Sequence, residues 1–189
     1  MPYITLPDGL PGITGPLAFR PETARPMRAL AEFLLRGPNT LSSADREIIA
    51  TYTSSQNDCH FCQTSHGAAA AAHLGKDAAV VDQVKQDFLH ANISDKLKAL
   101  LAIAGKVQKG GKNVTSKDVD NARQVGASDL EIHDTVLIAA AFCMYNRYVD
   151  GLDTVQPKDP AMYTAMGEHL AEHGYLKPSV EAPLALETK

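Results

Sequence analysis

The sequence of 189 residues has little of what marks secreted or nucleic-acid-binding proteins. Its three cysteines are an odd number, which argues against a framework of paired disulfides. No run of five like charges occurs, and 18 basic against 22 acidic residues give a net charge of -4. The basic surface of a general nucleic-acid binder is therefore missing, and we expect no nucleic-acid partner.

A membrane-spanning or export segment is also missing from the sequence. The longest useful apolar run, residues 136–144, is far shorter than the roughly 20 residues that a membrane-spanning helix needs. The first residues carry no basic region followed by an apolar run. We therefore expect a cytoplasmic protein without a membrane partner. In a reducing compartment, a pair of cysteines is a candidate for catalysis or metal binding.

Signals for β-strands are scarce, whereas apolar residues recur at helical spacing. Residues 1–21 contain five prolines and three glycines, a pattern that predicts an extended N-terminal arm without a helix. Residues 22–176 are expected to form a single all-α domain, a compact bundle of about seven or eight helices. Residues 177–189 are expected to be a loose C-terminal tail. The helices predicted within the domain run from about 22 to 36, 43 to 56, 59 to 74, 94 to 110, from 115 onward, 128 to 150 and 160 to 174.

Reactive side chains are concentrated in one predicted helix. Residues 59–73 contain two of the three cysteines and three of the seven histidines. On a helix, Cys59 and Cys62 are three residues apart, and Cys62 and His66 are four apart, so all three share a face. The helix N-terminus favours a thiolate at Cys59. A thiolate that attacks an electrophilic oxygen becomes a sulfenic acid, which a neighbouring thiol resolves as a disulfide. His66 is placed to carry the proton involved.

Two other interpretations of this cluster stay open. The cysteines could be small apolar core residues, because the alanine run at 68–72 indicates a tightly packed helix. The cluster could instead bind zinc, although structural zinc sites usually show two paired sets of ligands and no second pair exists here. The zinc ligands would be Cys59, Cys62, His66 and either His60 or His73.

Glu47 lies on the preceding predicted helix at the start of a polar stripe. The stripe continues at helical spacing through Thr51, Ser54 and Ser55. Periodicity alone favours a solvent-exposed face equally well. The break at 57–58, however, lets the next helix fold back, so that the stripe could face the cysteines. In that arrangement Glu47 accepts a proton or orients His66.

The spacing of Glu47, Cys59-x-x-Cys62 and His66 resembles the alkylhydroperoxidase D-like branch of the carboxymuconolactone decarboxylase superfamily. Residues 54–66 resemble the extended signature of that branch. The resemblance implies an all-helical fold, a homo-oligomer and thiol-dependent reduction of hydroperoxides.

A second motif supports the resemblance. Residues 146–152, Asn-Arg-Tyr-Val-Asp-Gly-Leu, resemble a subgroup described as peroxidase-related proteins. The two motifs, with the helix order between them, cover about residues 20–155. The alkylhydroperoxidase D-like domain is thus expected to be the helical domain of residues 22–176.

The resemblance also implies roles for the four residues. Cys62 is similar to the peroxidatic thiol that becomes sulfenic acid, and Cys59 to the resolving thiol that exchanges with an external reductant. Glu47 and His66 are similar to a proton relay. The family needs no metal and no organic cofactor, and its reductants are dithiols or thioredoxin-like partners.

Phe61 stands where the best-known peroxidase branch has a second histidine directly before the second cysteine. His60 is one helical step of about 100° away and does not substitute for it. This departure motivates an alternative function, a redox-switched binding or assembly protein in which peroxide turnover is incidental.

Other reactive side chains are interpreted as structural. Cys143 lies in the apolar run and is expected to be a buried core residue. Arg147 and Asp150, three residues apart, are expected to form an ion pair at a helix end.

Overall fold

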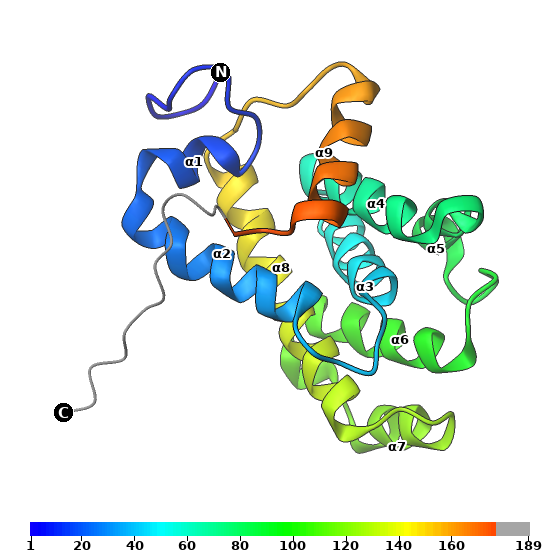
Figure 1. Cartoon of the computed structure of the whole chain (residues 1–189). Coiled ribbons are helices and arrows are strands. Elements are labelled where there is room, and N and C mark those ends of the chain that lie inside the picture. Colours follow the sequence, from blue (N-terminus) through cyan, green and yellow to red (C-terminus); the bar gives the residue numbers. More distant parts are fainter. Residues whose placement is uncertain (177–189) are drawn as a thin grey trace.

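The computed structural model describes residues 1–176, and this part of the chain contains helices and no strand (Figure 1). The all-α class is confirmed. Nine α-helices are present among the described residues, against about seven or eight expected, because α1 and α5 were not predicted. The tail predicted for 177–189 lies outside the described residues. The elements are α1 Thr14–Phe19, α2 Pro21–Arg36, α3 Ser43–Gln56, α4 His60–Leu74, α5 Val80–Asp87, α6 Asp95–Lys109, α7 Ser116–Gln124, α8 Asp129–Gly151 and α9 Pro160–His173, with 3₁₀-helices at Gly75–Asp77 and Gly111–Asn113.

The helices begin where side chains can satisfy their first backbone N–H groups. Ser42 accepts a hydrogen bond from Asp45 N at the start of α3, and Ser128 accepts one from Glu131 N at the start of α8. In both places the acidic side chain bonds back to the N–H of the serine, which completes a capping box. Such caps contribute about 1 kcal/mol each to the stability of α3, which carries Glu47, and of α8, which carries the second motif.

The prediction of an extended arm over residues 1–21 is wrong at its end, because Thr14–Phe19 forms α1 and Pro21 already begins α2. The prolines do not prevent these helices. Pro16 and Pro21 lie in first turns, where the backbone N–H has no partner within the helix in any case. Thr14 Oγ1 donates to the carbonyl of Pro11, which closes the turn before α1.

The core forms where α3, α6 and α8 meet, with α2 and α5 packed around them (Figure 1). Its largest fully buried apolar side chains are Leu35, Ile48, Ile49, Leu100, Leu101, Ile103, Ile138 and Phe142. A second, smaller cluster holds both motif cysteines. Helices α3 and α4 lie side by side, so the break at 57–58 does return the chain onto the polar stripe (Figure 1).

Helix α9 packs closely against α4 at Gly167. A Cβ atom at this position would lie 2.4 Å from the backbone carbon of Ala68, so only glycine allows the approach. This contact places α9 beside α4 (Figure 1), and the segment after α9 lies near His66 on α4.

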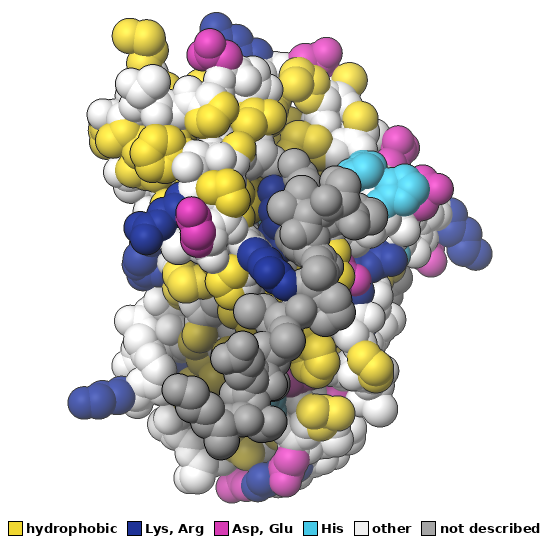
Figure 2. Space-filling model, turned by 60° about the vertical axis from the view of Figure 1, so that its left-hand side comes forward, with side chains coloured by type: hydrophobic (Ala, Val, Ile, Leu, Met, Phe, Trp, Pro, Cys, Tyr) yellow, Lys and Arg dark blue, Asp and Glu magenta, His cyan; other side chains and the backbone are white. Residues whose placement is uncertain are grey.

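Several large apolar side chains are exposed, and Figure 2 shows one face on which hydrophobic side chains gather between charged ones. Examples from the N-terminal quarter are Tyr3, Ile4, Phe19 and Phe33. Within residues 1–176, none of the helices has the length and apolarity that crossing a bilayer requires.

Candidate active site

The polar stripe on α3 faces the protein interior. Glu47 is 1% exposed, and Thr51 and Ser54 are also buried. Helix α4 covers this side of α3, so the solvent-exposed interpretation of the stripe is wrong. A buried carboxylate needs hydrogen-bond partners, and the partners of Glu47 define the site.

The first partner of Glu47 is His66. The His66 ring nitrogen Nδ1 lies 2.8 Å from Glu47 Oε2. The edge of the Phe142 ring is packed against the imidazole, with centroids 4.6 Å apart. Because Nδ1 is engaged by the carboxylate, Nε2 is the nitrogen left to exchange a proton with a substrate.

The second partner is Tyr175, which sequence reasoning missed. Its hydroxyl donates to Glu47 Oε1 and lies 3.3 Å from His66 Nδ1. Its ring is stacked on the imidazole, with centroids 5.8 Å apart and planes inclined by 11°. Tyr175 thus holds both members of the pair, and burial together with the charge of Glu47 raises the pKa of its hydroxyl well above the usual value.

Helix α2 anchors the segment that carries Tyr175. The Tyr175 backbone N–H donates to Glu32 Oε2 at 2.7 Å, and Arg36 Nη1 donates to the carbonyl of Ala171 at 2.7 Å. Gly174 ends α9 with φ +75°, a conformation that favours glycine. Gly174 predicts this helix end from the sequence, but no pattern points to the tyrosine after it, which lies 109 residues from His66.

The charge of His66 is set by two opposing effects. Burial disfavours the imidazolium, but the charge and hydrogen bond of Glu47, with the Cys62 thiolate, outweigh it and raise the pKa of His66. An imidazolium held in place by a carboxylate is suited to donating a proton to a leaving group.

Cys59 and Cys62 lie together at the start of α4, and both are free thiols. Cys59 is the N-cap residue and is 0% exposed, and Cys62 in the first turn is 3% exposed. A hydrogen bond between the two side chains, with burial, raises the pKa of Cys59. The same hydrogen bond lowers the pKa of Cys62 against the effect of burial, aided by the charge of His66. The structure thus favours a thiolate at Cys62 over the expected thiolate at Cys59, because the pKa of Cys59 is raised and that of Cys62 is lowered.

The second sequence motif meets the first at Asn146 on α8. Asn146 Nδ2 donates to Ser54 Oγ at 3.0 Å, and Asn146 Oδ1 accepts from Asn57 Nδ2 at 2.7 Å. A further hydrogen bond from Asn146 to Cys62 also lowers the pKa of that thiol. The motif at 146–152 thus contributes directly to the environment of the cysteine pair.

Asp150, four residues further along α8, hydrogen-bonds with the Cys59 thiol. Burial raises the pKa of the Asp150 carboxyl, while the bond to Cys59 lowers it in part. The predicted ion pair with Arg147 does not form: Arg147 Nη1 donates instead to the backbone carbonyl of Cys143 at 2.8 Å. Cys143 itself is half-buried and accepts a hydrogen bond from Asn57 Nδ2 at 3.5 Å, so it is less enclosed than expected.

The zinc interpretation has no support in the geometry. Within residues 1–176, no three histidine, cysteine, aspartate or glutamate side chains are arranged to hold a metal ion. His66 directs Nδ1 to Glu47, and the ring of His60 packs edge-on against Tyr163 at 5.9 Å.

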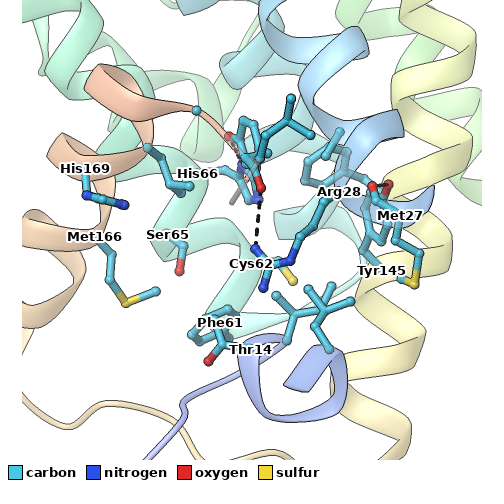
Figure 3. Close-up of a pocket in the computed structure, with 18 of the residues that line it drawn as sticks. Thr14, Met27, Arg28, Phe61, Cys62, Ser65, His66, Tyr145, Met166 and His169 are labelled. Carbon is cyan, nitrogen blue, oxygen red and sulfur yellow. Dashed lines mark hydrogen bonds between the residues drawn. The ribbon is translucent and has the colours of Figure 1, made fainter. Parts of the chain in front are cut away.

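A cavity of about 550 Å³ opens beside these residues (Figure 3). Cys62 and His66 both line it, whereas Cys59 does not. Most of the remaining lining is apolar and comes from α1, α2, α8 and α9. A small molecule in the cavity would therefore meet the Cys62 sulfur and the imidazole together.

The comparisons with known proteins identify the family of this chain. A family model described as "Carboxymuconolactone decarboxylase family" matches residues 21–85. An uncharacterized peroxidase-related protein from Ralstonia eutropha JMP134, described as alkylhydroperoxidase AhpD core, has a similar crystal structure with TM-score 0.74 and 30% sequence identity; the match covers 84% of this chain and 81% of that chain. The chain belongs to the alkylhydroperoxidase D-like group of the carboxymuconolactone decarboxylase superfamily.

A second solved structure is also similar to this chain. An uncharacterized peroxidase-related protein from Silicibacter sp. TM1040 is 25% identical, with TM-score 0.73, and the match covers 83% of this chain and 80% of that chain. Among curated proteins, none matches the sequence. The matched family region contains all four predicted site residues of this alkylhydroperoxidase D-like chain, whereas Asn146, Asp150 and Tyr175 lie beyond it.

Proposed function

We propose that this protein is a thiol-dependent peroxidase that reduces hydroperoxides through Cys62 and Cys59, with His66 and Glu47 as proton relay. One observation carries the proposal: the Cys62 thiol, whose pKa is lowered, lines a cavity together with an imidazole that a buried carboxylate holds. A low thiol pKa supplies the nucleophile, and the raised pKa of His66 supplies the proton donor.

In the first step the Cys62 thiolate attacks the terminal oxygen of a hydroperoxide. An S–O bond forms, the O–O bond breaks, and Cys62 is oxidised to sulfenic acid while the peroxide is reduced. The departing oxygen takes the proton from His66 Nε2 and leaves as an alcohol, or as water from hydrogen peroxide. Glu47 stabilises the imidazolium before the transfer, and Tyr175 keeps the carboxylate oriented.

In the second step Cys59 resolves the sulfenic acid. The Cys59 sulfur attacks the Cys62 sulfur and passes its proton to the Asp150 carboxylate. The S–O bond breaks, and the hydroxyl group leaves as water with a proton from His66, which has taken up a new proton from solvent after the first step. A disulfide and one water molecule result, and the hydrogen bond between Asp150 and Cys59 supports this route.

A dithiol or thioredoxin-like partner then reduces the disulfide and restores both thiols. Cys59 is fully buried in the reduced protein, so this exchange requires the start of α4 to open locally. No metal or organic cofactor takes part in the proposed cycle.

A second candidate is a redox-switched binding or assembly protein. Phe61, between the two cysteines, packs directly under Gly12, where a Cβ would lie 2.2 Å from its ring. Forming the disulfide would disturb this contact and with it the N-terminal segment, which carries exposed apolar residues. Two observations together would favour this candidate: a homo-oligomer that changes size when the protein is oxidised, and negligible turnover of hydroperoxide. A homo-oligomer and a cytoplasmic location remain predictions for both candidates.

The test is a coupled assay of hydroperoxide consumption with a dithiol as reductant. Cys62→Ser should abolish turnover, and Cys59→Ser should allow one oxidation and then stop recycling. Cys143→Ser is the matched control, because its thiol lies outside the cavity, and it should keep the wild-type rate. Wild-type rates in both motif variants would refute the peroxidase function.

A further inference from the structure

Ser65 has an unused hydroxyl at the edge of the cavity. The side chain is 3% exposed, and within residues 1–176 its Oγ has no hydrogen-bond partner. Among the described residues, five buried side-chain polar atoms have no hydrogen-bond partner. Of the five residues that carry these atoms, Ser65 is the one that lines the cavity. A buried hydroxyl without a partner is costly, so it calls for an explanation.

The neighbouring residue Thr64 shows that a hydroxyl on this part of α4 can form a hydrogen bond within the helix. Thr64 Oγ1 donates to the carbonyl of His60 at 2.7 Å, which is the usual solution for a hydroxyl on a helix. Ser65 instead directs its hydroxyl away from α4, toward the space bordered by Phe61, Cys62 and Met166 (Figure 3). It lies three residues after Cys62 and directly before His66, on the side of α4 that faces the cavity.

The rest of the cavity is mostly apolar, although Thr14, Arg28 and His169 also line it, and it matches a molecule of some size with a largely apolar body (Figure 3). Its volume of about 550 Å³ lies within the range of about 300–1,000 Å³ typical of sites for small organic molecules. Hydrogen peroxide would fill only a small part of it. The apolar side chains that line it include Ile13, Leu17, Met27, Phe142, Met162, Met166 and Leu170.

We propose that the Ser65 hydroxyl binds the peroxide group of the substrate beside the Cys62 sulfur, while the apolar lining of the cavity holds the body of a bulky organic hydroperoxide. The proposal rests on the peroxidase function proposed above and adds a substrate-contacting residue to it. The apolar lining takes the body of the substrate out of water, while Ser65 supplies a fixed hydrogen bond next to the reacting atoms.

The hydrogen bond matters most as the O–O bond breaks. Negative charge then develops on the oxygen that leaves, and the Ser65 O–H donates to this oxygen while His66 gives it a proton. The S–O bond to Cys62 forms in the same step, so Ser65 itself gains and loses no atoms. A donor already held in a buried site stabilises such charge better than water does.

The test compares single-turnover rate constants for oxidation of the reduced protein by hydrogen peroxide, tert-butyl hydroperoxide and cumene hydroperoxide. The wild type should react with cumene hydroperoxide at least about tenfold faster than with hydrogen peroxide. Ser65→Ala should lower the rate constant for each peroxide about tenfold. The matched control Thr64→Ala removes a hydroxyl outside the cavity and should stay within about twofold of the wild type.

Two further measurements separate substrate binding from a structural effect. Alanine suits a helix, and Ser65→Ala removes an unpartnered polar atom, so its thermal midpoint should equal or exceed that of the wild type. The pH at which the Cys62 thiolate forms, followed by ultraviolet absorbance, should not shift. Ala165→Phe, which narrows the cavity, should lower the ratio of the cumene hydroperoxide rate to the hydrogen peroxide rate.

The outcomes distinguish this proposal from the peroxidase function. A wild type that consumes none of the three peroxides refutes the function itself. An active wild type whose rates Ser65→Ala leaves unchanged refutes the role of Ser65. An active wild type that reacts with hydrogen peroxide as fast as with cumene hydroperoxide refutes the preference for a bulky substrate.

Discussion

The Glu47 carboxylate holds Nδ1 of His66 at 2.8 Å, across the interface between α3 and α4. Both side chains are largely buried. His66 lines the same cavity as Cys62. Two residues from adjacent helices thereby contribute to the lowered pKa of a third group, the Cys62 thiol, through the charge of His66.

Glu47→Gln should remove the charge that raises the pKa of His66. The rate of thiol oxidation should rise with pH as Cys62 ionises and fall as His66 loses its proton, giving a bell-shaped profile. In the variant the pKa of His66 falls, so the alkaline limb should move to lower pH and the maximum rate should drop roughly tenfold to hundredfold. A profile measured from pH 5 to 10 that is unchanged in Glu47→Gln would remove Glu47 from the relay.

Tyr175→Phe should keep the ring stacked on His66 while removing the hydrogen bond to Glu47. Because that leaves one carboxylate oxygen without its buried partner, we expect the free energy of unfolding to fall by about 1–2 kcal/mol. Tyr163→Phe is the matched control, since the Tyr163 hydroxyl is buried without a partner among the described residues, and it should be neutral or slightly stabilising. Denaturant unfolding of both variants checks the prediction; equal effects would contradict it.

Asp150→Asn should slow the second step of the cycle and spare the first. Without a carboxylate to accept the Cys59 proton, disulfide formation should slow about tenfold or more, and the sulfenic acid should accumulate. Rapid mixing with a hydroperoxide, followed by quantitation of trapped sulfenic acid over time, separates the two steps. Asp153→Asn provides a control, because Asp153 pairs with the N-terminal amine. An Asp150→Asn protein that forms its disulfide at the wild-type rate would contradict the role.

Local spacing was enough to predict part of this site. Cys62 and His66 share a helix, so their common face follows from a separation of four residues. The contact from Glu47 to His66 needed the fold, because the same stripe on α3 equally suited a solvent-exposed surface.

The residues that the sequence failed to reveal owe their places to long-range packing. Tyr175 reaches His66 because α9 packs on α4 and α2 anchors the segment after it. Asp150 has a local candidate partner in Arg147, but the fold brings it to Cys59. Helix α1 was missed because prolines argue against helices in general, whereas in a first turn they are tolerated.

The central claim is that Cys62 is the thiol that hydroperoxides oxidise. Its most direct test uses Cys59→Ser, in which the sulfenic acid has no neighbouring thiol to resolve it. After one equivalent of cumene hydroperoxide and a reagent that traps sulfenic acids, peptide mass spectrometry should find the adduct on Cys62 and leave Cys143 unmodified. An adduct on Cys143 alone, or none on Cys62 while peroxide is still consumed, would contradict the account.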